Sequence, residues 1–220
     1  MFDFEYLLYS LRIVLKGVPV TLIVSIGTIV LAILIGLIVG IITFTKTKIL
    51  YPIAKVYVSI FRSTPTIAQI FLFYYGLGAI SMIVNRMDPL VAAIIVLSLN
   101  SGAYISETVR GGLEGVSTGQ KEAGLALGLS KNQVMRQIVV PQGLPAILPS
   151  LFNTFINIVK GTSITFMIGV LDIMGMARTE GARSFQYLEI YAAVMIVYWV
   201  IIQVLEIIGT QVEKRISYER

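Results

Sequence analysis

The sequence predicts an all-α, polytopic membrane protein with about five transmembrane helices. Of its 220 residues, 56% are hydrophobic and only 13% are charged, whereas a soluble domain carries about 25% charged residues. The apolar residues gather in long runs, and one of them, from Gly17 to Thr45, has 29 residues without a charge. At ~1.5 Å of rise per residue, a helix of that length exceeds a hydrocarbon core of ~30 Å.

The composition also excludes several functions. Cysteine and histidine are absent, so the chain lacks a disulfide framework, a thiolate nucleophile and the usual zinc ligands and general base. We therefore expect no catalytic residue, no metal and no cofactor in this chain. The phosphate-binding pattern G-x-x-x-x-G-K-[ST] is also missing, so ATP cannot bind here by that route.

Residues 1–16 are expected to form an interfacial helix. Aromatic and leucine side chains supply apolar surface between charged residues, which is typical of a helix lying in the headgroup region; the alternative is a frayed terminus. Acidic residues at positions 3 and 5 argue against a cleavable signal peptide. Residues 17–220 are then a single transmembrane domain, whose first span is Gly17–Thr45.

The second span is placed within Ser63–Asn85. Thr64 as N-cap and Pro65 at the first helical position are typical of a helix start. The preceding segment, Tyr51–Phe61, is apolar and also expected to be helical. Two helices therefore meet near residue 63. They form either a broken helix that lines a cavity or a simple cytoplasmic turn.

Spans three and four, Pro89–Thr108 and Leu144–Val170, each carry a polar stripe. Asn100, Tyr104 and Glu107 share one helical face in span three. Span four has a longer stripe: Ser150, Asn153, Asn157, Lys160 and Ser163. Ionisable residues inside a membrane usually face a bundle interior or water, so the stripe favours a pathway lining over helix packing alone.

The fifth span is Ile190–Thr210, and its aromatic residues are expected at the membrane interface and in packing. With five spans the termini lie on opposite sides. One set of loops holds eleven lysines and arginines, the other five. The positive-inside rule then places the N-terminus outside and the C-terminus and the loop at about 110–137 in the cytoplasm. This placement accounts for the net charge of +5, and nucleic-acid binding is not indicated.

The polar loop at 110–137 is predicted to contain structure of its own. Gln120–Leu127 is rich in helix formers, with Glu122 expected in the first turn. Gly128 is placed as a left-handed C-cap, and Ser130–Gln133 has the form of a capping box that starts another helix. The loop also carries three leucines, at 125, 127 and 129, which either pack on its own helices or dock a partner.

These residues resemble a known family. Glu122-Ala123-Gly124, Gly128, Ile138 and Pro141 resemble the "EAA" loop of binding-protein-dependent ABC importer permeases. Three further motifs resemble the polar amino acid (histidine/glutamine) branch: Phe61–Pro65, Tyr104–Gly112 and Lys160–Ser163. Two departures are Gly124, where alanine is common, and Gly161, where aspartate is common.

The resemblance implies a multi-pass subunit of the cell (inner) membrane that moves polar amino acids. Its partners would be a second permease, identical or a sister chain, an ABC ATPase that carries ATP and Mg²⁺, and an extracytoplasmic amino-acid-binding protein. We expect the ATPase to contact the cytoplasmic loop. The candidate coupling residues are Gly119, Gln120, Glu122, Ala123, Leu125, Ala126, Gly128 and Leu129.

An amino acid substrate carries a carboxylate and an ammonium group, so its site needs complementary charges or dipoles. The candidates are Lys160, Thr162, Ser163, Asn157, Asn100, Glu107, Thr64 and Asp172. Lys160 is the available cation. Glu107 is more consistent with a structural ion pair to Arg110 three residues later, and Asp172 either meets substrate on the outer side or lies in a loop. Acids along the path would favour a basic substrate.

Two other functions are weighed against this one. A standalone secondary carrier or channel for a small polar solute would be expected to show an inverted repeat or paired acids at mid-membrane, and neither is evident. A membrane-embedded enzyme would need a nucleophile and base together, which the sequence does not offer. Transport that requires a co-purifying ATPase would distinguish an importer permease from a standalone carrier or channel and from an enzyme.

Overall fold

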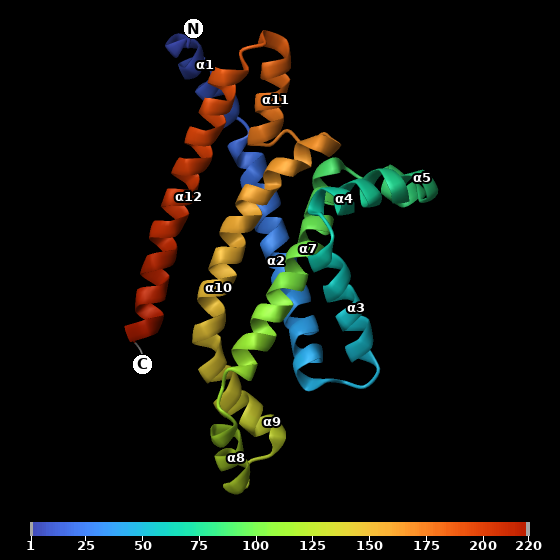
Figure 1. The fold of residues 1–220 in the computed structure, drawn as a ribbon, viewed down its shortest axis with the longest axis vertical. Helices are drawn as coiled ribbons and strands as arrows, with labels where there is room; N and C mark the ends of the chain where they lie inside the picture. The colour runs from blue at the N-terminus through green and yellow to red at the C-terminus, as the bar shows by residue number, and fades with distance from the viewer. Residues whose placement is uncertain (1, 219–220) are drawn as a thin grey trace.

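The computed structural model describes residues 2–218, and within them every regular element is a helix. The molecule is elongated, with α2, α7, α10 and α12 running roughly along its long axis (Figure 1). The short helices α8 and α9 form one end of the bundle, and α1 and α11 lie toward the other. The helices of the loop predicted at 110–137 thus project beyond the ends of the long helices.

The N-terminal helix is part of the bundle. α1 (Phe4–Leu15) begins at Asp3, whose side chain accepts a hydrogen bond from the Tyr6 backbone N–H at 3.0 Å. Leu7 and Val14 are buried in a cluster with residues of α11 and α12. The predicted helix is therefore confirmed, with one face packed on the bundle, while its depth in the bilayer stays a prediction.

The first span is one continuous helix, α2 (Val18–Thr45), as predicted. Its partner is α7 (Pro89–Glu114), which begins at Asp88, an N-cap that accepts from the Leu90 N–H at 2.8 Å. The two helices form the largest helix–helix interface of the described chain. They approach closely because glycine stands at the contact: a Cβ on Gly36 would lie 2.6 Å from the Cβ of Ile105.

The second span is broken. α3 (Leu50–Ser63) runs alongside α7, and the next segment then turns sideways (Figure 1). The two halves meet at 111°. The sideways segment contains four elements: α4 (Thr66–Phe71), the π-helix η1 (Leu72–Leu77), α5 (Gly78–Ile80) and α6 (Met82–Asn85). The predicted range of 63–85 is therefore only the second half of this span.

The predicted cap at the break is wrong in detail. Thr64 has extended backbone angles, φ −118° and ψ 148°, and α4 begins at Thr66, one residue after Pro65. A residue before proline is pushed out of the α region by the proline ring. The Thr64 hydroxyl instead donates to the Ile60 carbonyl at 2.8 Å, so it closes α3 and does not start α4.

The fourth span is longer than predicted and changes its helix type three times. α9 (Lys131–Val134) continues through the π-helix η2 (Met135–Val139) into α10 (Val140–Gly161). The 3₁₀ helix η3 (Thr162–Ile168) completes the span.

A helix was not anticipated between spans four and five. α11 (Ile173–Ser184) lies in the segment treated as an outer loop, because its apolar residues are too few to stand out from composition alone. α12 (Tyr187–Tyr218) follows it. Figure 1 shows α11 and the start of α12 beside α1 at one end of the molecule.

About five spans are confirmed for the described residues. Four segments are long and apolar enough to cross a membrane: Phe4–Thr45, Pro89–Glu114, Lys131–Ile168 and Tyr187–Gln211. The bent pair Leu50–Ser63 and Thr66–Ile80 makes a fifth. Two of the cations assigned to loops, Lys55 and Arg62, lie within α3. The orientation across the membrane stays a prediction.

Candidate translocation path and coupling surface

A polar cavity of about 260 Å³ lies between α4, α7 and α10. Its lining combines hydroxyl and amide groups with a few apolar side chains; the polar members are Thr66, Asn100, Ser101, Tyr104, Thr154 and Asn157. Asn100 and Asn157 were predicted on separate spans, and the fold brings them to one cavity. The cavity lining contains neither a carboxylate nor an ammonium group among the described residues.

The broken span positions one wall of this cavity. A helix that ends inside a bundle leaves carbonyl groups without partners, which is costly away from water. Here the Phe61 carbonyl accepts from the Gln69 amide at 3.0 Å and from the Asn100 amide at 3.1 Å. Asn100 also donates to the Gln69 Oε1 at 3.0 Å. These two amides connect the end of α3 to α4 and α7, so specific side-chain hydrogen bonds stabilise the break.

The stripe on α10 is exposed in the single chain. Asn153, Asn157 and Lys160 all have exposed side chains, and only Asn157 reaches the cavity. Lys160 follows Asn157 by three residues and makes no ion pair with any side chain that the structure describes. The stripe therefore presents amides and an ammonium group to whatever covers this face of the molecule.

Three predicted hydroxyls do not join the cavity. Thr162 is fully buried and donates to the Val159 carbonyl at 2.9 Å, with the Tyr198 hydroxyl 3.5 Å away. Ser163 donates to the Lys160 carbonyl at 2.8 Å. Thr64 lies on the other side of the break, where it lines an apolar groove of about 450 Å³.

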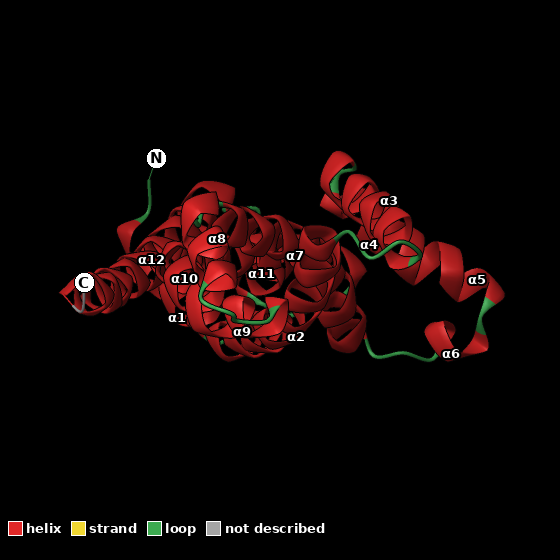
Figure 2. Cartoon of the chain, turned by 90° about the horizontal axis from the view of Figure 1, so that it is seen from below, coloured by secondary structure: helices red, strands yellow, loops and turns green. Residues whose placement is uncertain are grey.

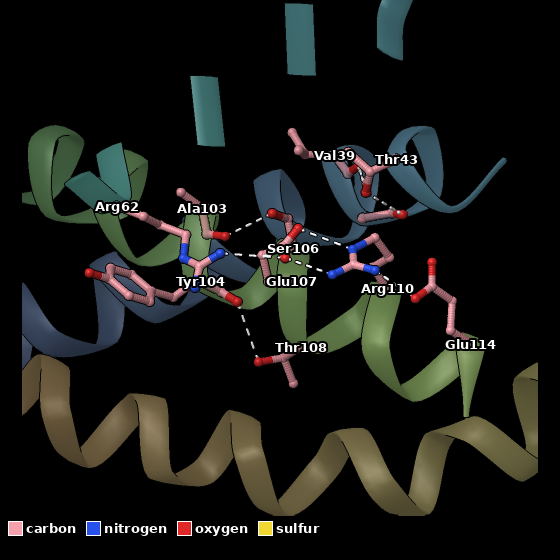
Figure 3. A network of polar contacts seen from close by, with 11 residues as sticks. Val39, Thr43, Arg62, Ala103, Tyr104, Ser106, Glu107, Thr108, Arg110 and Glu114 are labelled. Carbon is pink, nitrogen blue, oxygen red and sulfur yellow. Dashed lines mark hydrogen bonds and ion pairs between the residues drawn. The ribbon is translucent and has the colours of Figure 1, made fainter. Parts of the chain in front are cut away.

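Glu107 belongs to a charged network on the side of α7 that faces α3 (Figure 3). Its carboxylate lies 2.8 Å from Arg110 and 3.4 Å from Arg62, and Arg110 also contacts Glu114 at 2.6 Å. The Arg62 guanidinium stacks over the Tyr104 ring. The predicted pair with Arg110 is confirmed, and Arg62 extends it to the broken span, so this carboxylate is engaged by two arginines.

Asp172 is far from these groups and caps a helix. It is fully buried, and its Oδ1 accepts from the Gly175 N–H at 2.8 Å at the start of α11. Its other oxygen has no hydrogen-bond partner among the described residues. Burial raises the pKa of this carboxyl to about 6. Asp172 thus caps the start of α11.

The loop helices are close to those predicted. α8 (Thr118–Ala126) is capped by Ser117, Gly128 has the left-handed φ of 86°, and Ser130 with Gln133 forms the capping box. One detail is wrong: the helix begins two residues earlier than expected, so Glu122 lies beyond its first turn.

The three leucines of the loop divide between packing and exposure. Leu129 packs against the cluster that contains Val134 and Val139. Leu125 and Leu127 are 44% and 84% exposed. Gly124 faces inward, and a Cβ there would lie 2.6 Å from the Cδ1 of Ile138. The helix is therefore seated closely on the chain, with two leucines left on its outer surface.

The remaining predicted coupling residues are also on the outside of the loop. Four of them have exposed side chains or backbone: Gly119, Glu122, Ala123 and Ala126. Gln120 lines an open groove of about 900 Å³ between this loop and the start of α10. Figure 2, the view from below, shows α8 and α9 in front of the ends of the long helices.

Sequence reasoning missed part of the cavity and of the break beside it. Thr66, Ser101 and Thr154 line the cavity but were not singled out, although Ser101 follows Asn100 and Thr154 follows Asn153. Gln69, which bonds the end of α3, was also missed. Gln69 is the one polar amide between two apolar stretches of α4 and η1, and a single polar residue in a membrane segment is the signal that marks it.

The chain was compared with known proteins. A family model described as "Binding-protein-dependent transport system inner membrane component" matches residues 32–218. The chain is 37% identical over 215 residues to the "Probable amino-acid permease protein YxeN" of Bacillus subtilis, covering 98% of this chain and 96% of that one. It is 34% identical to the "Glutamine transport system permease protein GlnP" of Escherichia coli, covering 98% of each.

Solved structures agree with this match. A chain in the "Crystal structure of an amino acid ABC transporter with histidines" superposes with a TM-score of 0.89 at 28% identity, covering 98% of this chain and 99% of that one. A chain of the MetNI methionine ABC transporter superposes with a TM-score of 0.80 at 22% identity, covering 93% and 96%, and shows the fold alone. With the broken span, the polar cavity and the projecting loop, these matches establish that this chain belongs to the family of binding-protein-dependent transport system inner membrane components, the permease subunits of ABC transporters.

Proposed function

We propose that this chain forms half of the translocation path of an ABC importer for polar amino acids. The observation that carries the proposal is the polar cavity between α4, α7 and α10 together with the exposed stripe beside it. A lone ammonium group facing lipid costs about 2.5–3.5 kcal/mol at mid-membrane on insertion scales. Covering Lys160 with a second permease and water removes that cost.

The second permease is either an identical or a sister chain. An ATPase subunit with ATP and Mg²⁺ docks on the loop, where Leu125 and Leu127 supply exposed apolar surface, and an extracytoplasmic binding protein delivers the substrate. Relatives with the same fold support these partners, since the family is named for dependence on a binding protein.

The cavity favours a substrate whose side chain is polar and uncharged. Amides and hydroxyls can hydrogen-bond such a group, whereas a cation would lack a carboxylate partner in the lining that the structure describes. Glu107 is engaged by Arg62 and Arg110, and Asp172 is buried at a helix start. Neither acid offers the partner that the expectation of a basic substrate requires, and Lys160 next to the cavity disfavours a second positive charge.

Lys160 is the sharpest test of the path. In the assembled transporter, Lys160→Cys should react with a membrane-impermeant thiol reagent and be protected by substrate, since the natural chain has no competing cysteine. Met195→Cys, on the exposed face of α12 at 74% exposure, is the lipid-facing control. A cysteine at 160 that is no more reactive than the control in the resting and ATP-bound states contradicts the assignment.

Substrate class is tested separately. Uptake into vesicles that contain the full transporter should be inhibited more strongly by glutamine than by arginine or glutamate. A preference for arginine would overturn the uncharged-substrate assignment and leave the path assignment intact.

A further inference from the structure

A second polar groove of about 420 Å³ lies between the end of α2, α3 and the last turns of α7. Its lining carries four cations and two carboxylates: Lys46, Lys55, Arg62, Arg110, Glu107 and Glu114. The formal charge of the lining is therefore 4 − 2 = +2. Figure 1 shows α3 diverging from α7 toward this end of the bundle.

The two carboxylates are already occupied. Glu107 is paired with Arg62 and Arg110, and Glu114 is paired with Arg110 (Figure 3). Lys46 and Lys55 have no carboxylate within ion-pair distance in the part of the chain that the structure describes. Lys55 instead lies 5.6 Å from the centre of the Tyr51 ring. The excess positive charge is thus carried by two lysines of the lining whose side chains are exposed.

α3 itself is amphipathic. Tyr51, Lys55 and Arg62 line the groove, whereas Ile53 and Val56 lie on another face of the helix, outside the groove, at 64% and 59% exposure. These side chains belong to a membrane-spanning pair of helices, so acyl chains are their natural surroundings. Basic pockets between transmembrane helices bind anionic lipid headgroups. A ligand with one anionic end and an apolar body fits both surfaces, whereas a free phosphate would use only the first.

From this arrangement we infer that the groove between α2, α3 and α7 is a binding site for an anionic phospholipid. Its phosphate lies between Lys46 and Lys55, and its acyl chains run along the exposed apolar face of α3. A lipid there would bear on the α3–α7 contact through Arg62 and Glu107, which joins the broken span to the bundle. The site is distinct from the cavity at Asn100 and does not depend on which substrate is moved.

The test uses the full chain purified in detergent and native mass spectrometry, with dioleoyl phosphatidylglycerol and dioleoyl phosphatidylcholine as probes. The unmodified protein should retain phosphatidylglycerol preferentially. The double variant Lys46→Gln/Lys55→Gln should lose about fivefold of that preference for each lysine removed. Lys48→Gln is the matched control, because Lys48 lies in the same connection but does not line the groove.

Lys55→Arg keeps the charge and should keep most of the preference, and an unchanged unfolding midpoint shows that the double variant is folded. Equal retention of the two lipids by the unmodified protein would overturn the inference, as would an equal loss in Lys48→Gln. Displacement of phosphatidylglycerol by inorganic phosphate at comparable concentration would also overturn it, because the groove would then be a site for a free anion.

Discussion

Single residues on the polar faces of this protein divide into those that close helix ends and those left free. Asn100 and Gln69 cap the C-terminal end of α3, and Asp172 caps the N-terminal end of α11. All three side chains therefore form hydrogen bonds with backbone groups. Asn153 and Asn157 are exposed instead. Asparagine therefore has a structural role on α7 but is exposed on α10. Variants at the two places should differ in their effect on stability.

Replacement of Asn100 by leucine should destabilise the break between α3 and α4. The change leaves one donor fewer at the Phe61 carbonyl and frees the Gln69 Oε1, and a buried polar group left unsatisfied costs about 1–3 kcal/mol. The measurement is thermal unfolding of the detergent-purified protein. Asn153→Leu, on the exposed stripe, is the matched control and should change the midpoint little; equal losses would refute the capping role.

Asp172 should make stability fall as pH rises. Its folded pKa is raised to about 6 from 3.8, so between these values the folded state binds more protons than the unfolded state. The free energy of unfolding therefore decreases from about pH 4 to about pH 6 and is lowest above that window. Asp172→Asn keeps a capping side chain and abolishes this dependence.

We expect Asp172→Asn to raise the unfolding free energy by about 1–3 kcal/mol at pH 7, since each pKa unit corresponds to about 1.4 kcal/mol. Unfolding midpoints of both proteins measured from pH 4 to pH 8 check this. If the midpoint of the unmodified protein rises through that window relative to the variant, the carboxyl is stabilised as its anion and the argument fails.

Between elements, glycine sets how closely the helices approach. α7 meets α2 through Gly36 and meets α10 through Gly112 and Gly143. In membranes, small residues allow close backbone contact, which supplies the packing that the hydrophobic effect provides in water. The helical periodicity of the sequence does not reveal which glycines have this role, because it does not show what lies opposite.

Adjacent glycines of α7 offer a direct test. A Cβ on Gly112 would lie 2.9 Å from the Cδ1 of Ile147 on α10, whereas a Cβ on Gly111 would meet nothing within 4 Å. Gly112→Val should lower the unfolding free energy by about 1–3 kcal/mol through overpacking. Gly111→Val should have little effect. Similar midpoints for the two variants would show that α10 can shift without cost.

For the whole molecule, the loop helices α8 and α9 are the part that projects farthest from the bundle (Figure 1). They are nevertheless seated on it: Lys121 lies 5.6 Å from the centre of the Phe44 ring at the end of α2, and its Nζ lies 3.5 Å from the Leu113 carbonyl of α7. A force applied to α8 by a partner would therefore reach two spans directly.

Leu127→Glu should uncouple ATP hydrolysis from uptake. Leu127 is 84% exposed, so the change does not disturb the fold but places a charge in the apolar surface proposed to meet the ATPase. We expect uptake to fall at least about tenfold, which corresponds to a loss of about 1.4 kcal/mol, with an unchanged unfolding midpoint. Ile83→Glu, also exposed at 80% but distant from the loop, is the control. Normal uptake in Leu127→Glu would contradict the proposed contact.

The sequence by itself determined the class of this protein, most of its spans and the small helices of the loop. These features depend on local chemistry: a charge-free run must be buried in lipid, Gly128 is free to adopt a positive φ, and Ser130 with Gln133 caps its own helix. The family resemblance was based on short motifs in this loop and in three of the spans, and the match of the family model to residues 32–218 confirmed it.

Tertiary structure alone decided the angle of 111° at the break of the second span and which polar residues meet. The Phe61 carbonyl is capped by amides 8 and 39 residues away in the sequence, and Glu107 of the predicted stripe pairs with Arg62 on a different helix. Periodicity places a side chain on a face of its own helix, but the neighbour of that face is set by how helices pack. That packing depends on contacts such as Gly36 with Ile105, which no local pattern specifies.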